Sequence, residues 1–308
     1  MPTVFSLSRT ALNQIDLEPI GEVTSDALTD GVTSATVYQK DSKITLAIYR
    51  RGDGELRLLS ASSFAPILVD KASLAIGDSY DQVCTFHIGN RAHAMCYRKK
   101  SGQVAFFEIE GGILSTYPYR YARLHEPATT TNLSMLDTFV NRGLVSFMGY
   151  SYETGQVALY TLNVTATSTG GAPPLICHHV WAGTWSPGWV RFFFFEMGGA
   201  NFFLKTNVAR LNVNIDRIYD DLSQGTAEVA SHLEAHLPGA VDIVSLRGFY
   251  MEGGEPFFAA VGADGTLSVY RIHPDCRGWT QVATRKGFTT QIQLLPFTIN
   301  GRTLLLVF

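Results

Sequence analysis

The stretch WVRFFFFEMGGANFFLKTNVARLNVNIDRI, residues 189–218, predicts three consecutive β-strands. An apolar run ends at Gly198-Gly199, NFFLKT forms the second run, and LNVNIDRI alternates apolar with polar residues. Short runs of this kind, bounded by glycine-containing turns, are typical of strands. The weaker segment TAEVASHLEA, residues 226–235, follows, so the whole unit predicts a four-stranded sheet.

A second unit, residues 241–284, repeats this order. Its segments are VDIVSLRGFYM, EPFFAAV, TLSVYRI and GWTQVAT, with glycine turns between the first three. The turn between the second and third strands also recurs earlier in the chain, at Asp53-Gly54, Ser101-Gly102 and Thr154-Gly155. Such turns need a positive φ, which glycine adopts without a Cβ clash, so we expect tight hairpins at these positions.

An aromatic residue near the end of an apolar run, shortly before a turn, marks the period of the repeat. Six positions fit this description: Tyr38, Phe86, Phe139, Phe195, Tyr250 and Phe297. Their gaps are 48, 53, 56, 55 and 47 residues, and the count from Phe297 through the C-terminus and on from the N-terminus to Tyr38 is 49. Periods of about 40–50 residues built from short strands indicate propeller blades. We expect these aromatic side chains to pack between neighbouring blades.

The last unit contains only two strands, FTTQIQLLPF and RTLLLVF, before the chain ends. The first residues supply the missing pair, PTVFSLS and LNQIDLEPIG. The sequence therefore predicts an all-β fold, a six-bladed β-propeller whose closure blade combines residues 1–24 with about 287–308. A blade shared by both termini hides sheet edges that otherwise promote aggregation. Residues 1–308 are expected to form a single domain.

Composition narrows the class of protein. Hydrophobic residues make up 46% of the chain and charged residues 17%, which is enough apolar material for a large core. The net charge of −3 gives no basic footprint for nucleic acid. No apolar run reaches the ~18 residues that a membrane span needs, and the N-terminus has no signal-peptide pattern, so a cytoplasmic protein is expected. The four cysteines show no metal or redox spacing and are expected to be reduced.

Motifs for common cofactors are missing from the sequence. No glycine-rich phosphate loop, HExxH, CxxC pair or nucleophile elbow is present. His178-His179 is the only adjacent histidine pair, and on a strand the two side chains point to opposite faces. We therefore expect neither a cofactor nor a metal.

The polar residues differ from blade to blade, which favours one functional site over six equivalent ones. Tryptophan occurs only at four positions, three of them within WAGTWSPGW, residues 181–189. A propeller has one unique location, the mouth of its axial channel. The loops that lead into the first strand of each blade are expected to reach the rim of this mouth. Its predicted substrate-binding residues are Tyr80, Asp81, His125, Trp185, Trp189, His236 and Arg285, and its predicted catalytic residues are Arg191, Arg247 and Lys286.

Structural roles are an alternative for several of these residues. An arginine on a first strand is costly to bury unpaired, so Arg191 and Arg247 face water, a salt-bridge partner or a ligand. Trp185 and Trp189 are equally well explained as hydrophobic caps on a blade. The functional hypothesis is a small-molecule pocket with aromatic walls, one or two cations and hydroxyl groups.

The units from Trp189 to Ile218 and from Val241 to Ile272 resemble a propeller repeat of lectin-like fungal and bacterial proteins. The shared features are a Gly-Trp start, a glycine turn, and a strand ending in Ile-Asp-Arg-Ile or Val-Tyr-Arg-Ile. Size and blade number are similar to those of fucose-binding fungal lectins, whose repeated Trp, Arg and Glu set is missing here. This resemblance implies a carbohydrate-binding propeller without catalytic activity.

In architecture and size, with a single site, the chain also resembles the fungal hetero-Diels–Alderases of tropolonic sesquiterpene biosynthesis. That resemblance implies a cofactor-free cyclase that joins a tropolone o-quinone methide to a humulene-type alkene, a small hydrophobic substrate, in specialised metabolism. It assigns no catalytic residue. A pericyclic ring closure needs no nucleophile, metal or redox cofactor, which is compatible with the missing motifs. Protein-interaction scaffolds and hydrolases or lyases of unrecognised type stay open as further classes.

Overall fold

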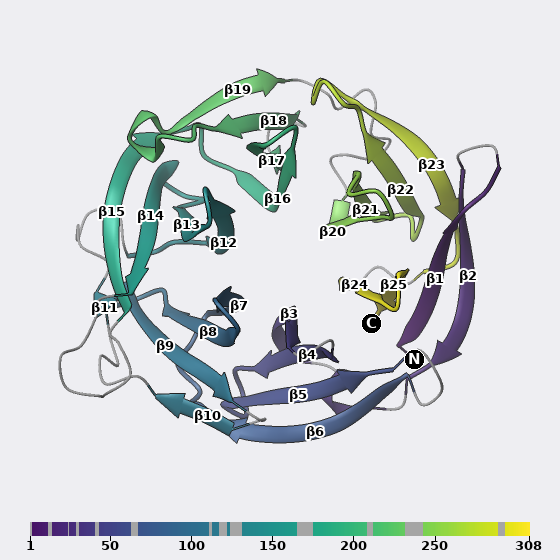
Figure 1. Ribbon diagram of the computed structural model, residues 1–308, viewed down its shortest axis with the longest axis horizontal. Coiled ribbons are helices and arrows are strands. Elements are labelled where there is room, and N and C mark those ends of the chain that lie inside the picture. The colour runs from purple at the N-terminus through teal and green to yellow at the C-terminus, as the bar shows by residue number, and fades with distance from the viewer. Residues whose placement is uncertain are drawn as a thin grey trace. The chain divides into compact units, whose positions relative to one another are not determined.

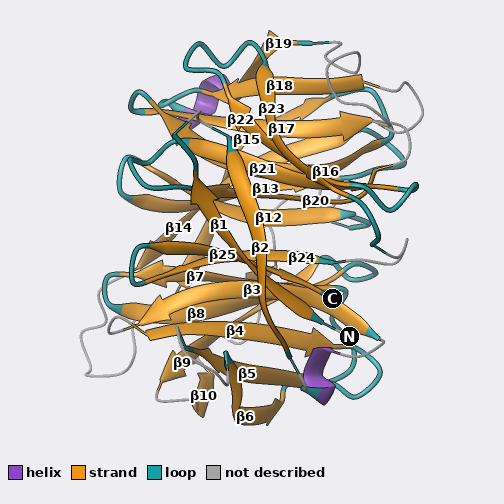
Figure 2. Cartoon of the chain, turned by 90° about the vertical axis from the view of Figure 1, so that its right-hand side faces the viewer, coloured by secondary structure: helices purple, strands orange, loops and turns teal. Residues whose placement is uncertain are grey.

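The computed structural model describes residues 2–11, 14–23, 25–28, 31–40, 43–62, 67–110, 113–116, 122–123, 131–164, 175–207, 212–231, 243–288 and 293–308. Nearly all regular structure in these residues is β-strand (Figure 2). The helices are two single 3₁₀ turns, η1 (Asp26–Leu28) and η2 (Leu222–Gln224). The strands form six antiparallel sheets, so the prediction of a six-bladed β-propeller is confirmed (Figure 1).

Three of the sheets occupy the middle of the chain. The first is β3 (Val32–Lys40), β4 (Lys43–Arg50), β5 (Glu55–Ala61) and β6 (Leu68–Ala75). The second is β7 (Gln82–Ile88), β8 (Arg91–Arg98), β9 (Gln103–Glu110) and β10 (Ile113–Thr116), and β11 (Ala122–Arg123) also pairs with β9. The third is β12 (Met135–Asn141), β13 (Leu144–Tyr150), β14 (Gln156–Val164) and β15 (Leu175–Thr184).

Two further sheets correspond to the units that first indicated the repeat. One is β16 (Trp189–Met197), β17 (Ala200–Asn207), β18 (Asn212–Ile218) and β19 (Thr226–Ala230). The other is β20 (Ile243–Tyr250), β21 (Pro256–Gly262), β22 (Leu267–Ile272) and β23 (Trp279–Arg285). The predicted strand order within each unit is correct.

The sixth sheet is shared by the two ends of the chain, as predicted. Its order is β2 (Ile15–Glu22), β1 (Thr3–Arg9), β25 (Arg302–Val307) and β24 (Leu294–Ile299). Antiparallel pairing places Val4 opposite Leu306 and Phe5 opposite Leu305. The N-terminal strands therefore complete the closure blade that the last two strands leave open.

Glycine conformations confirm the predicted hairpins between second and third strands. Gly54, Gly102, Gly155 and Gly265 have φ values of 67°, 67°, 74° and 72°. A Cβ at Gly155 would lie 2.0 Å from the carbonyl oxygen of Trp185, and the carbonyl of Gly155 accepts a hydrogen bond from the Trp185 N–H at 2.9 Å. Glycine is thus needed both for the turn and for the close approach of the segment that follows the fourth strand.

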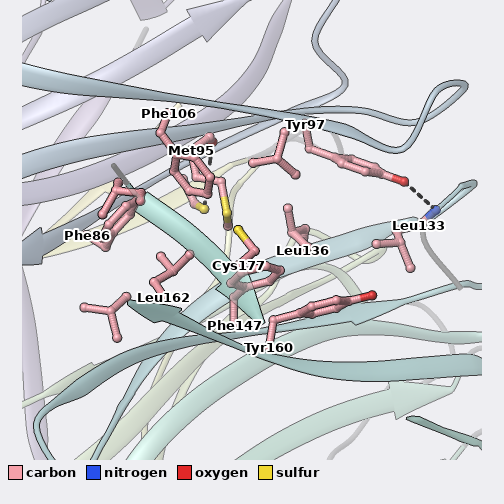
Figure 3. Close-up of a cluster of buried hydrophobic side chains, with 14 of the residues drawn as sticks. Phe86, Met95, Tyr97, Phe106, Leu133, Leu136, Phe147, Tyr160, Leu162 and Cys177 are labelled. Carbon is pink, nitrogen blue, oxygen red and sulfur yellow. Dashed lines mark hydrogen bonds between the residues drawn. The ribbon is translucent and has the colours of Figure 1, made fainter. Parts of the chain in front are cut away.

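The cores lie between adjacent sheets. Figure 3 shows one of them: Phe86, Met95 and Phe106 face Phe147 and Tyr160 across two sheets. Phe147 and Tyr160 stack with ring centroids 4.7 Å apart. At the edge of this core the Tyr97 hydroxyl accepts a hydrogen bond from the Leu133 N–H at 3.0 Å. Such interdigitated packing fixes neighbouring blades against each other.

For one of the six aromatic residues that mark the repeat, the predicted packing position is wrong by one residue. Tyr38, Phe86, Phe139, Phe195 and Phe297 are buried as expected, but Tyr250 is 40% exposed. Phe249 is 6% exposed and takes the packing position. Successive side chains of a strand point to opposite faces, so this shift by one residue sends Tyr250 away from the core.

The chain divides into two compact units, each with three sheets. One unit contains residues 1–24, 63–67 and 188–308, and the other contains residues 25–62 and 68–187. The organisation of residues 1–308 as a single domain stays a prediction. In the part of the chain that the structure describes, no helix is long and apolar enough to cross a bilayer. The four cysteines are free and buried.

An arginine bridge in the second unit should make stability depend on acid pH. Arg57 contacts Asp26 at 2.7 Å and Glu55 at 3.1 Å, and hydrogen bonding to Arg57 lowers the pKa of both carboxyl groups. A folded-state pKa below the unfolded value stabilises the fold above the unfolded value, and this contribution disappears as the pH falls through the folded value.

We therefore expect Arg57→Met to be less stable than the parent protein at pH 7, with the difference closing as the pH falls below about 4. Urea denaturation of both proteins between pH 2.5 and 7 measures it. Arg57→Lys is the control, because it keeps the charge but loses the two-pronged contact. A stability difference that is independent of pH would contradict the prediction that Arg57 stabilises the fold through the ionised carboxylates of Asp26 and Glu55.

Candidate functional site

A pocket of about 730 Å³ lies between the β16–β19 and β20–β23 sheets. We call it the β16/β20 pocket. Its volume is within the roughly 300–1,000 Å³ range of small-molecule sites. Its lining residues come from the ends of β16, β20 and β22, the start of β21 and the turns beside them: Glu196, Met197, Gly198, Tyr250, Gly253, Gly254, Glu255, Pro256, Arg271, Ile272, His273 and Pro274.

Glycine turns open this pocket. Gly198, Gly253 and Gly254 have φ values of 59°, 89° and 74°, and no atom lies within 4 Å of the position that a Cβ would take at any of them. The turns that follow β16 and β20 therefore carry no side chain at these three positions, which leaves the space beside them open. Met197, Pro256, Ile272 and Pro274 supply apolar wall.

Tyr250 places a phenol at this pocket. Its hydroxyl accepts a hydrogen bond from the Glu196 N–H at 2.6 Å, which ties the end of β20 to the end of β16. Burial raises the pKa of Tyr250, and the hydrogen bond from Glu196 opposes that shift. The phenol is therefore protonated at neutral pH and keeps an O–H to donate to a ligand.

The charged groups of the pocket differ in how they are paired. Glu255 forms an ion pair with Arg9 of β1 at 2.6 Å. Among the described residues, the half-buried Arg271 guanidinium and the exposed Glu196 carboxylate have no hydrogen-bond or ion-pair partner. His273 shares a hydrogen bond between Nε2 and the Thr280 hydroxyl at 2.9 Å. Arg271 is thus a donor whose hydrogen-bonding capacity is available to a ligand.

The pocket can bind an oxygen-bearing molecule with an apolar body. Arg271 and Tyr250 donate hydrogen bonds, Glu196 accepts them, and the proline, methionine and isoleucine side chains contact hydrocarbon. The described residues contain no group of three or more His, Cys, Asp or Glu side chains that could hold a metal ion. The lining residues supply hydrogen-bond donors, an acceptor and apolar contacts that can bind and orient a ligand.

The predicted rim residues of the second unit have structural contacts. Tyr80 is 2% exposed and packs against Tyr49 and Phe107, so it belongs to a core. Asp81 pairs with Arg51 at 2.7 Å and accepts a hydrogen bond from the Lys99 N–H. Trp185 is half-buried and stacks on Tyr150.

In the first unit, Trp189 is also buried, at 4% exposure, with the Lys205 ammonium 4.7 Å from its ring. Arg285 donates to the Leu17 carbonyl at 2.9 Å and lies over Phe5, whereas Lys286 is exposed. The buried tryptophan therefore fits the alternative of a packing role better than that of a substrate contact.

Among the predicted catalytic residues, the structure places Arg191 and Arg247 close enough for the charge of one to act on the other. Arg191 lies at a bulge of β16 with φ 56° and donates to the Val244 carbonyl of β20 at 2.9 Å. Burial lowers the pKa of Arg191, and the charge of Arg247 lowers it further. Arg247 is exposed on β20. Their catalytic role stays a prediction.

His125 and His236 lie outside the described residues. None of the other eight predicted site residues, which are all described, lines the β16/β20 pocket. Sequence reasoning missed this pocket because it treated Tyr250 as packing and the Val-Tyr-Arg-Ile strand end as a repeat signature. The available signal was the paired Gly-Gly turns of the two adjacent repeats, at 198–199 and 253–254.

Comparisons with known proteins support the fold. No protein-family model and no curated protein sequence matches the chain. Among solved structures, AofleA from Arthrobotrys oligospora is similar with a TM-score of 0.56 and 11% identity, over 89% of this chain and 79% of that one. The periplasmic gluconolactonase PpgL of Pseudomonas aeruginosa is similar with a TM-score of 0.53 and 10% identity, over 89% and 75%. A protein from Lactobacillus plantarum has a TM-score of 0.53 and 14% identity, over 92% and 82%. Identities this low carry the architecture and no function.

Proposed function

We propose that the chain is a cofactor-free hetero-Diels–Alder cyclase that joins a tropolone o-quinone methide to a humulene-type alkene, and that the β16/β20 pocket binds the reactants. One observation carries this proposal. The Arg271 guanidinium has no hydrogen-bond or ion-pair partner among the described residues, and it lies beside apolar side chains that line the same pocket. The chain's resemblance to fungal hetero-Diels–Alderases supplies the reaction class.

The ring closure is balanced without any co-reactant. The heterodiene of the quinone methide, O=C–C=C, and the alkene C=C react together. One C–O and one C–C bond form, three π bonds are replaced by one, and no proton or electron leaves. The protein has to hold the two partners at reacting distance, which in favourable cases lowers a barrier by about 7–11 kcal/mol.

Arg271 and Tyr250 are the groups that act on the reacting oxygen. Negative charge develops on the quinone-methide oxygen as the new bonds form, and a donor aimed at that atom stabilises the transition state. The alkene lies against Met197, Ile272 and the two prolines. These apolar side chains also disfavour the addition of water to the quinone methide.

Incubating the purified protein with the quinone-methide precursor and humulene tests the proposal. We expect faster product formation and a single stereoisomer, compared with the mixture formed in buffer. Arg271→Gln should slow the reaction by roughly ten- to a hundredfold, because one transition-state donor is lost.

Arg217→Gln is the matched control, since Arg217 occupies the corresponding strand position of the preceding repeat and does not line the pocket. Arg191→Gln and Arg247→Gln test the predicted rim. A product ratio that equals the buffer reaction would remove the proposal. Activity that survives Arg271→Gln but not the rim variants would move the reaction to the rim.

Carbohydrate binding is the second candidate, favoured by the exposed ring of Tyr250 beside Arg271 and Glu196. An aromatic face next to paired donors and acceptors suits a sugar ring. Glycan-array binding that is lost in Tyr250→Ala, together with no effect on the cycloaddition, would establish this function instead.

A further inference from the structure

A second pocket, of about 340 Å³, lies between the β7–β10 and β12–β15 sheets, and we call it the β7/β12 pocket. It occupies the position in the repeat that corresponds to the β16/β20 pocket. Residues 87–89 follow the buried Phe86 as residues 196–198 follow the buried Phe195. On the neighbouring sheet, residues 143–145 and 162–164 correspond to 254–256 and 272–274.

The lining of the β7/β12 pocket has changed from charged to apolar. Leu144 stands where Glu255 stands in the other pocket, and His87 replaces Glu196. The pocket is lined by His87, Ile88, Gly89, Gly143, Leu144, Val145, Leu162, Asn163 and Val164. No residue in this set carries a permanent charge, so the pocket does not select an ionic ligand.

Exposed apolar side chains gather at this pocket. Leu144 is 53% exposed and Val164 is 45% exposed, although the described part of the chain exposes few large apolar side chains. Both line the pocket. Covering exposed apolar side chains with the hydrocarbon part of a ligand is favourable, because it removes them from water. Exposed apolar side chains at the mouth of a concave site are therefore typical of a ligand site.

Two polar groups limit the chemistry of the occupant. The Asn163 side chain has no hydrogen-bond partner among the described residues. The Nε2 atom of His87 is buried and likewise without a partner in the part of the chain that is described. An amide offers both a donor and an acceptor, so an alcohol hydroxyl can satisfy it in either direction.

We propose that the β7/β12 pocket is a second ligand site, for a small uncharged alicyclic molecule that carries one hydroxyl group. Ile88, Leu144, Val145, Leu162 and Val164 cover the hydrocarbon, and Asn163 hydrogen-bonds the hydroxyl at the wall. The site does not depend on the function of the β16/β20 pocket.

Methyl-labelled protein tests this site directly, because the large apolar side chains among its described lining residues are isoleucine, leucine and valine. We expect cyclohexanol and menthol to cause saturable NMR shifts at the methyl groups of Leu144, Val145, Leu162 and Val164. Cyclohexane should bind more weakly than cyclohexanol. Asn163→Leu should remove that preference while leaving cyclohexane binding unchanged.

Leu144→Glu should weaken cyclohexanol and menthol binding by tenfold or more, because it places a carboxylate at the mouth. Val69→Glu is the matched control, since Val69 is 48% exposed on β6 and does not line the pocket. Shifts that fail to saturate, or that survive Leu144→Glu, would overturn the proposal. Methyl shifts that depend on protein concentration without ligand would also overturn it, by showing that the patch binds another copy of the chain.

Discussion

Asp216→Ala should lower the free energy of unfolding by about 3–5 kcal/mol, because it leaves a buried ammonium without its counter-ion. Lys205 of β17 and Asp216 of β18 form an ion pair at 2.6 Å, with side-chain exposures of 4% and 5%. Burial lowers the pKa of Lys205 and raises the pKa of Asp216, and their mutual attraction opposes both shifts. Each charge is therefore tolerated only while the other is present.

The surroundings of the pair sharpen this expectation. The Lys205 ammonium lies 4.7 Å from the Trp189 ring centroid and 5.3 Å from that of Phe203. These ring faces attract a cation, but they cannot replace the charge of a carboxylate at a buried ammonium. The charge of a second carboxylate, Glu228, also raises the pKa of Lys205, but Glu228 accepts a hydrogen bond from Asn214 at 2.7 Å and acts after Asp216 in size.

Replacing both residues separates two contributions to the free energy of unfolding: the cost of burying one charge without its partner and the net contribution of the ion pair. Lys205→Met combined with Asp216→Leu should cost clearly less than Asp216→Ala alone, because no charge is left buried. Guanidinium denaturation of the single and double variants measures both effects. A double variant at least as unstable as the single one would show that packing, rather than charge, dominates at this position.

The fold was accessible from the sequence because its signals are local. Glycine at four of the turns between second and third strands, short alternating runs and a period of 47–56 residues are read from neighbouring residues. The two strands before the end of the chain, left without partners in the last unit, identified the closure blade. The Lys205–Asp216 pair was not accessible, because NFFLKT and LNVNIDRI do not reveal that the register places these side chains on one face.

The candidate site was less accessible because it depends on single-residue register. Counting Tyr250 instead of Phe249 as the packing aromatic turned a pocket residue into a core residue. The opposite error was made for Tyr80 and Trp189. Both were expected at the rim of the channel, and both are buried in the structure. Strand patterns identify which residues alternate, but the face that each side chain occupies also depends on bulges such as the one between Val190 and Phe193.

Gly248→Ala should also be strongly destabilising, by about 3 kcal/mol, because there is no room for a methyl group at this position. A Cβ on Gly248 of β20 would lie 1.9–2.1 Å from Cδ2, Cε2 and Cγ of the Phe193 ring. Phe193 is 8% exposed on β16 and stacks on Phe195 at 5.4 Å. The Cγ atom is fixed close to the backbone, so a rotation of the ring cannot relieve the clash, and the β16–β19 and β20–β23 sheets must separate.

Gly183→Ala is the matched control for this prediction. Its Cβ would lie 2.4 Å from the outer edge of the Trp181 indole, the far end of a half-buried side chain that can turn away. We expect a change below about 1 kcal/mol there. In a Phe193→Ala background the space beside Gly248 is empty, so adding Gly248→Ala should cost much less than in the parent protein. Equal costs in the two backgrounds would mean that Phe193 is not the obstacle, and that contact between the two sheets does not depend on a glycine at position 248.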